Sequence, residues 1–279
     1  MKRNRKASLL ILTGILIPAL SFGYSKPESR ASIDWSAGKI TAQGVSTIRT
    51  SPDGRPWCDE GRYISLNESR LRASDRARDI AMEKLVSILK TLSLDSRETL
   101  DAMLRRSEFT RKKLSHQLKQ ISKQKTIPAG YFESACTLEI SIRDIITTLP
   151  FNFPNEEFPL RIDNTIETEY SSLIIDTRGL KIVPMLFPAI VNSRGKEVFS
   201  RLHINIKKAG PSGMVTYVLS EQKAMNHRRA GIHPYYAVAL KKVNGSPVLS
   251  ERDIRKIYSS QKTMQQLKDC RVIFIIDRK

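Results

Sequence analysis

The pattern of apolar and polar residues predicts strands and two long helices in the first half of the chain. Between Ser65 and Leu92, apolar side chains recur every three or four positions, as on one face of a helix. Ser65 followed by Glu68 matches a capping box, which predicts where this helix begins. Asp95 followed by Glu98 predicts a second helix that runs to about residue 125. Strands are predicted at residues 40–48, 62–66 and 136–142.

The second half is predicted to consist mainly of strands separated by turns. Its all-apolar run Val272–Ile276 is typical of a central strand that is buried on both faces. A helix is predicted from Ser250, as the N-cap, to Asp269. Further strands are predicted at residues 172–176, 182–191, 214–219 and 235–241.

Three phenylalanines and three prolines within residues 150–159 mark a boundary between the two halves. We therefore predict an α/β (α+β) protein of two mixed-sheet domains, at residues 24–149 and 170–279, joined by a linker at 150–169. In the first domain, a long helix pair is expected to pack on a small sheet.

Residues 1–23 have the three parts of a secretory signal peptide. A basic start, Met1–Ser8, precedes an almost wholly apolar run from Leu9 to Leu20, and Ser21 and Gly23 supply small residues for cleavage. An uncleaved anchor helix is the alternative, although the apolar run is short for a membrane span. The sequence therefore predicts an exported protein, periplasmic or associated with the outer membrane.

The charge balance indicates the class of partner. The chain carries 47 Lys and Arg against 28 Asp and Glu, and removing the four basic residues of the signal peptide lowers the net charge from +19 to +15. Such an excess favours anionic partners. Because an exported protein rarely meets nucleic acid, we exclude nucleic acid and expect anionic cell-wall polymer, a membrane surface or an acidic protein assembly.

The predicted second helix carries the densest charge. Residues 105–125 hold eight basic residues and one acid, and Phe109 lies among the bases rather than on the apolar stripe. A solvated helix face is the ordinary explanation of such a run. Repulsion between unbalanced charges favours the alternative, a surface that binds an anionic partner. The candidate residues are Arg105, Arg106, Phe109, Lys112, Lys113, Lys119 and Lys123.

Two smaller features are interpreted as structural. Asp176 and Arg178 stand two apart at a strand end, so both side chains point to one face. They are predicted to form an ion pair that locks a turn, with a recognition pair at a domain or subunit contact as the alternative. In an oxidising compartment Cys58 and Cys136 are the candidate disulfide, with Cys270 free; three buried free thiols are an equally open alternative.

The sequence contains no recognisable catalytic or cofactor motif. G-x-G-x-x-G, P-loop, H-E-x-x-H and G-x-S-x-G motifs are absent, and His116, His203, His227 and His233 are scattered. Six Ser-x-x-Lys matches lack an accompanying Lys-Thr-Gly. We therefore expect no enzyme activity, no metal site and no cofactor.

The run SSLIIDTRGLKIVPMLFPAIVNSRGKEVF, from Ser171 to Phe199, resembles a segment of the bacterial LPP-type lipoprotein family, which includes the flagellar assembly protein FlgP. The closing CRVIFIID, Cys270–Asp277, and the order strand, Ala- and Arg-rich helix, second helix and strand are also similar. The resemblance implies an envelope protein without catalytic residues, associated with the flagellum in several members. The chain departs from the lipid-anchored members because it lacks a lipobox cysteine.

We therefore expect a non-enzymatic structural or assembly protein of the cell envelope, associated with the flagellum and needed for motility. Its expected partners are envelope or flagellar proteins, or a second copy of the chain. The alternative function is a periplasmic module that binds anionic cell-wall polymer or lipid head groups.

The signal peptide predicts cleavage after Gly23, because Ser21 and Gly23 occupy the −3 and −1 positions. N-terminal sequencing of the exported protein should return Tyr24 as the first residue. An exported protein that begins at Met1 would contradict the prediction and indicate an uncleaved anchor.

Overall fold

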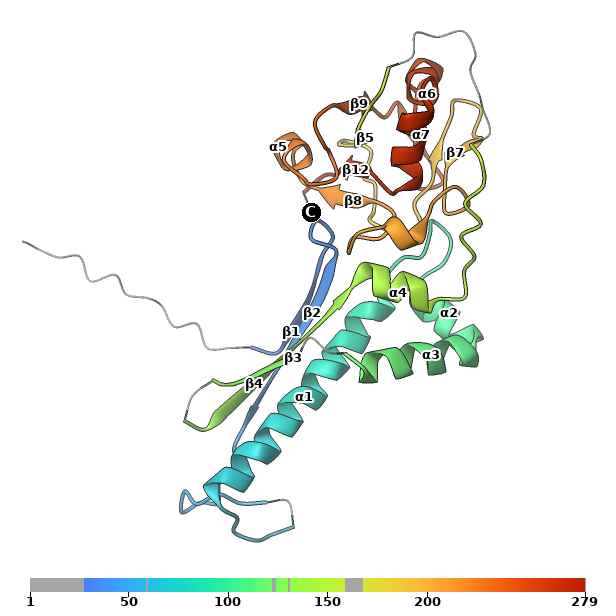
Figure 1. The fold of residues 1–279 in the computed structure, drawn as a ribbon. Coiled ribbons are helices and arrows are strands. Elements are labelled where there is room, and N and C mark those ends of the chain that lie inside the picture. The colour runs from blue at the N-terminus through green and yellow to red at the C-terminus, as the bar shows by residue number, and fades with distance from the viewer. Residues whose placement is uncertain (1–27, 59, 122–123, 130, 159–167, 279) are drawn as a thin grey trace, which may run out of the picture.

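The computed structural model describes residues 28–58, 60–121, 124–129, 131–158 and 168–278. It shows an α+β fold of more than one domain, with helices and mixed sheets in both halves (Figure 1), as the sequence predicts. The predicted signal peptide and Lys123 lie outside the described residues.

The first domain contains a four-stranded antiparallel sheet. The N-terminal hairpin forms one side of this sheet and a later hairpin forms the other, so the two strands in the middle come from distant parts of the sequence. The strands, in spatial order, are β1 (Arg30–Asp34), β2 (Lys39–Thr47), β4 (Glu133–Ser141) and β3 (Gln124–Pro128).

One long helix, α1 (Leu66–Lys90), packs along this sheet (Figure 1). The Ser65 hydroxyl accepts a hydrogen bond of 3.1 Å from the Glu68 N–H, which confirms the predicted N-cap. Gly44 of β2 lets the helix approach, because a Cβ there would lie 2.1 Å from the Ala77 carbonyl oxygen. The buried stripe recurs every four residues through Ala73, Ala77, Ala81, Leu85 and Leu89.

The prediction of a second long helix was wrong. The chain forms two short helices instead, α2 (Leu100–Arg106) and α3 (Glu108–Lys119), which break at the extended residue Ser107. The Ser107 hydroxyl accepts from the Thr110 N–H at 3.2 Å, so it caps α3 and competes with a continuous helix. The expected long helix pair is therefore one long helix with two short ones, and α4 (Ile142–Thr148) follows β4.

The second domain is built on a four-stranded parallel sheet. Its spatial order is β8 (Thr216–Val218), β12 (Val272–Ile275), β5 (Ser172–Asp176) and β9 (Pro234–Val238). Every residue of β12 is buried, which confirms the predicted central strand.

Helices cover both faces of this parallel sheet. The predicted helix at 250–269 is divided into α6 (Glu251–Tyr258) and α7 (Gln261–Lys268), which share the main core with one face. The short helix α5 (Glu221–Met225) packs through Ala224 on the other face.

A second, smaller sheet lies in the same domain. Of the strand predicted at 182–191, only the last two residues pair in a sheet, because Pro184 and Pro188 have no N–H to donate. A short 3₁₀ helix, Ile206–Lys208, precedes β8 in the sequence. The sheet contains, in order, β10 (Lys241–Val243), β11 (Ser246–Val248), β6 (Ile190–Val191) and β7 (Glu197–Phe199).

The two domains share one continuous hydrophobic core that includes residues from Ile40 to Ile276. The described start of the segment predicted as a linker packs on the second domain, where Phe151 lies 4.5 Å from Phe187 between ring centroids and Phe158 stacks on His203. Burial on this scale leaves the domains docked rather than joined by a free linker.

The docking seam lies where the β1–β2 turn meets the loop at residues 210–213. Across this seam, the Arg143 N–H donates to the Pro211 carbonyl at 2.9 Å and the Ser212 hydroxyl donates to the Ser36 carbonyl at 3.3 Å. Gly38 has a φ of +71°, and a Cβ added there would lie 2.1 Å from the Ser212 nitrogen. Only glycine satisfies both the left-handed backbone and this close approach.

Gly38→Ala should therefore destabilise the protein by about 3 kcal/mol, because it adds a steric clash with backbone to the strain of a positive φ. Gly54→Ala is the matched control, since Gly54 has a φ of +82° but nothing within 4 Å of an added Cβ. The control should cost only about 1 kcal/mol. Urea unfolding measures both, and equal losses would show that the seam is not tightly packed.

Candidate functional site

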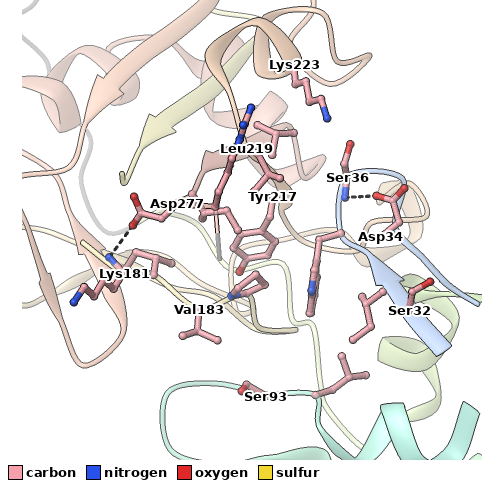
Figure 2. Close-up of a pocket in the computed structure, with 18 of the residues that line it drawn as sticks. Ser32, Asp34, Ser36, Ser93, Lys181, Val183, Tyr217, Leu219, Lys223 and Asp277 are labelled. Atoms are coloured by element: carbon pink, nitrogen blue, oxygen red, sulfur yellow. Dashed lines mark hydrogen bonds between the residues drawn. The ribbon is translucent and has the colours of Figure 1, made fainter. Parts of the chain in front are cut away.

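A cavity of about 1230 Å³ lies between the two domains (Figure 2). One wall comes from the first domain, through the β1–β2 turn and the residues that follow α1. The other wall comes from the carboxyl ends of β8 and β12 and from the segment after β5. Open parallel sheets bind ligands at this edge, so the position itself favours a binding site.

A second cavity of about 410 Å³ continues the first. The two share Ser93, Lys181 and Val183 in their linings and extend together as far as Asn244 and Gly245. We call the two cavities together the interdomain groove.

Apolar and aromatic side chains form the floor of the groove. Trp35 packs edge-on against Tyr217 with ring centroids 5.4 Å apart, and Figure 2 shows Tyr217 in the middle of the cavity. The Tyr217 hydroxyl donates to the Met185 carbonyl at 3.1 Å and accepts from its N–H at 3.2 Å. Burial raises the pKa of Tyr217, so this hydroxyl stays neutral and holds the opposite wall in place.

The acidic residues of the groove are occupied by backbone amides. Asp34 accepts from the Ser36 and Ala37 N–H groups at 2.9 and 2.8 Å. Asp95 accepts from the N–H groups of Arg97 and Glu98 at 2.7 and 3.0 Å. Asp277 accepts from the Gly179 and Lys181 N–H groups at 2.9 and 3.2 Å. Each carboxylate therefore closes a turn rather than binding a basic side chain.

Five basic side chains in the groove lining are exposed and have no acidic partner among the described residues. Lys223 enters from α5 and Lys181 from the segment after β5, at opposite ends of the view in Figure 2. Within the described part of the chain, Lys242 is the one of these five whose side chain makes a hydrogen bond, to the Lys181 carbonyl at 3.1 Å. The five are Arg97, Lys181, Lys223, Lys242 and Arg278.

The predicted structural ion pair is present beside this groove. The Arg178 guanidinium donates to both Asp176 carboxylate oxygens, with Nε–Oδ1 at 2.8 Å, and the Tyr236 hydroxyl donates to Oδ2 at 2.8 Å. These bonds hold the pKa of Asp176 at about 2, with the Arg178 side chain as the largest cause. The pair fixes the start of the turn whose far end is held by Asp277.

The predicted basic helix face is not one surface. Arg105 and Arg106 end α2, whereas Phe109, Lys112, Lys113 and Lys119 belong to α3, so the break at Ser107 separates them. Arg105 binds Asp101 at 2.7 Å, Arg106 binds Glu98 at 2.8 Å and Lys112 binds Glu108 at 3.1 Å. Asp101 and Glu108 lie four residues before the bases that they bind, and Glu98 lies just before α2. Phe109 is exposed, as the sequence predicts.

The predicted Cys58–Cys136 bridge does not form in the structure. Both residues are buried free thiols, as is Cys270. Cys58 lies in the loop before α1, where its thiol donates to the Arg62 carbonyl at 3.2 Å. Cys136 lies within β4 opposite Gly44, where the sheet meets α1. Separate elements therefore hold the two sulfur atoms, and the alternative of three free thiols is the arrangement found.

Among the described residues, no three His, Cys, Asp or Glu side chains gather into a candidate metal site. Within the same residues, no helix combines the length and apolar character needed to cross a membrane. The four histidines stay separate, and His203 is buried against Phe158, which lowers its pKa.

Sequence reasoning missed the groove because its basic residues come from five separate segments. Each is one ordinary surface cation in the sequence, and none lies in a charge run. The available local signal was Gly179 and Lys181 shortly after the predicted strand at 172–176, since in a parallel sheet the residues there meet the ligand edge.

Residues 172–278 match the model of the second domain of Treponema pallidum Tp0624. The match starts at the first residue of β5 and extends past β12, so this part of the chain is similar to a single domain of that protein. It includes the parallel sheet and one wall of the groove. The first domain, which supplies the other wall, lies outside the match. No curated protein matches the chain.

The Asp176–Arg178 pair predicts a specific loss of stability in acid. Because the pKa of Asp176 is lowered from 3.8 to about 2 on folding, its contribution is complete above pH 4 and disappears as the pH falls toward 2. Asp176→Asn should cost about 1–2 kcal/mol at pH 7, allowing for solvent screening of Arg178. It should also lose less stability than the wild type between pH 4 and 2.

Urea unfolding at several pH values measures this effect. Asp75→Asn is the control, because Asp75 is an exposed carboxylate on α1 and its replacement should change stability by less than about 0.5 kcal/mol. An Asp176→Asn variant that keeps the acid sensitivity of the wild type would contradict the prediction.

Proposed function

We propose that this protein is an exported, non-enzymatic binding protein of the bacterial envelope, whose interdomain groove holds an extended anionic partner. One observation carries the proposal: five exposed basic side chains, with no acidic partner in the part of the chain that the structure describes, surround an apolar floor. The excess of Lys and Arg over the whole chain supports an anionic partner as well.

Both the basic side chains and the apolar floor are needed to bind a partner with useful affinity. An exposed ion pair contributes only about 0.2–1 kcal/mol, because water and salt screen it. Burial of apolar surface adds about 25 cal/mol for each Å², and Trp35, Val183 and Leu219 offer such surface in the groove. A partner with acidic groups and apolar groups along one chain fits the groove best.

The predicted signal peptide and the LPP-type resemblance support an envelope location and a role in assembly. A groove that binds one segment of a partner can retain that partner within a larger assembly without catalysing a reaction. On this proposal, the role in the flagellum and in motility that the resemblance implies arises because the groove binds a flagellar or envelope protein. Anionic cell-wall polymer and lipid head groups are the alternative partners.

The proposal predicts that charge reversal in the groove weakens binding of an acidic chain. Lys181→Glu together with Lys223→Glu should weaken binding of a fluorescent acidic peptide that also carries apolar residues at least about tenfold, because two attractions become repulsions. Added salt should weaken wild-type binding in the same way. Fluorescence anisotropy measures the affinity, and circular dichroism confirms that the variant is folded.

Lys113→Glu together with Lys119→Glu on α3 is the matched control, since it changes the net charge equally on an exposed surface outside the groove lining. The control should change affinity less than about twofold if the groove is the site. Equal losses of affinity in both variants would show that binding depends only on the net charge of the protein and not on the groove. A loss confined to the α3 variant would instead place binding on the basic face predicted from the sequence.

A further inference from the structure

The strand β1 presents its backbone to the interdomain groove. Ser32, Ile33 and Asp34 are consecutive in β1, and all three line the groove. Because successive side chains of a strand point to opposite faces, a cavity lined by consecutive residues meets the edge of the strand. The groove therefore lies along the rim of the first sheet rather than over one of its faces.

This rim of the sheet has no strand partner. β1 is the outermost strand in the order β1-β2-β4-β3, and all five of its residues pair with β2 on the other side. Among the described residues, no strand pairs with the outer edge of β1. An edge of this kind offers unpaired N–H and C=O groups, which another extended chain can bind as an added strand.

A backbone edge favours a polypeptide over the other anionic chains. Only a polypeptide carries donors and acceptors at the spacing of a β-strand, about 3.4 Å for each residue. Glycan and lipid anions can bind the lysines but cannot continue the ladder of β1. Natural sheets protect such edges, and exposure beside an apolar floor is typical of a site that takes up a strand.

The groove also specifies which polypeptide fits. Side chains of an added strand would alternate between the apolar floor at Trp35 and Tyr217 and the basic rim that includes Lys181 and Lys223. The floor favours apolar residues, and the unpartnered cations favour Asp or Glu. Acidic residues that alternate with apolar ones would meet both requirements.

We propose that the interdomain groove binds an extended acidic segment of another protein, which adds as a new strand to the free edge of β1. The inference rests on the groove being the binding site, and it names the partner as a polypeptide. The added strand would extend the first sheet toward the carboxyl edge of the parallel sheet in the second domain.

The test starts from a display library of short random peptides, panned on the mature full-length protein. Peptides that bind should alternate acidic and apolar residues, and should lose binding to the Lys181→Glu, Lys223→Glu variant. The best peptide is then resynthesised with a single N-methyl group at each position in turn. N-methylation removes one backbone donor and leaves the side chain unchanged.

Strand addition predicts a period of two in this scan. Every second N-methyl group should weaken binding about tenfold, because it removes a backbone hydrogen bond and leaves its acceptor unpaired, while those between should change affinity little. Hydrogen exchange should show new protection of β1 amides when the peptide is bound. The Lys113→Glu, Lys119→Glu variant should retain the peptide.

The possible failures separate the two proposals. A scan without a period of two, for a peptide that still depends on Lys181 and Lys223, would overturn strand addition and leave the groove as the binding site. Peptides that bind the groove variant and the wild type equally would overturn both. A library without binders, while an anionic polysaccharide or anionic vesicles bind through Lys181 and Lys223, would show that the partner is not a polypeptide.

Discussion

The contact between the β1–β2 turn and the loop at residues 210–213 determines how the two halves of the molecule meet. Gly38 makes this contact possible, because its positive φ and missing side chain let two backbone segments touch. Arg229 supports the loop from within the second domain, donating to the Gly213 and Met214 carbonyls at 2.6 and 3.3 Å. Burial lowers the pKa of Arg229 to about 10, still well above neutral pH, so the guanidinium remains charged.

The groove follows from this contact. Docking at the turn brings the edge of one sheet to the carboxyl edge of another, and Trp35 next to the turn packs on Tyr217 to form the floor. Neither domain alone has both walls. The match to a single domain of Tp0624 covers one wall only, so the site in this chain depends on the pairing of that domain with the preceding one.

The charge of the groove has a simple structural origin. Turns that line it use Asp34, Asp95 and Asp277 to bind backbone N–H groups, which stabilises the turns. Among the described residues, these three carboxylates form hydrogen bonds to backbone N–H groups and no ion pair with the Lys and Arg side chains of the groove. On α2 and α3 the opposite holds, because acids nearby in the sequence bind Arg105, Arg106 and Lys112.

The sequence by itself determined the features that depend on neighbouring residues. Helical periodicity and the Ser65 cap predict α1, an unbroken apolar run predicts β12, and a spacing of two predicts the Asp176–Arg178 pair. Where local signals compete, the sequence does not show which one prevails. Apolar periodicity predicts one continuous helix across Ser107 and one strand before β6, whereas the Ser107 cap and the prolines interrupt them.

Only the tertiary structure decided where the groove lies and which charges stay free. Arg97, Lys181 and Lys223 are separated by many residues in the sequence. They line one groove only because the two domains pack together at the close backbone contact of Gly38. The same holds for the thiols, since Cys58 and Cys136 share a domain but lie in different elements. Spacing along the chain cannot report such distances, because they depend on how separate elements pack.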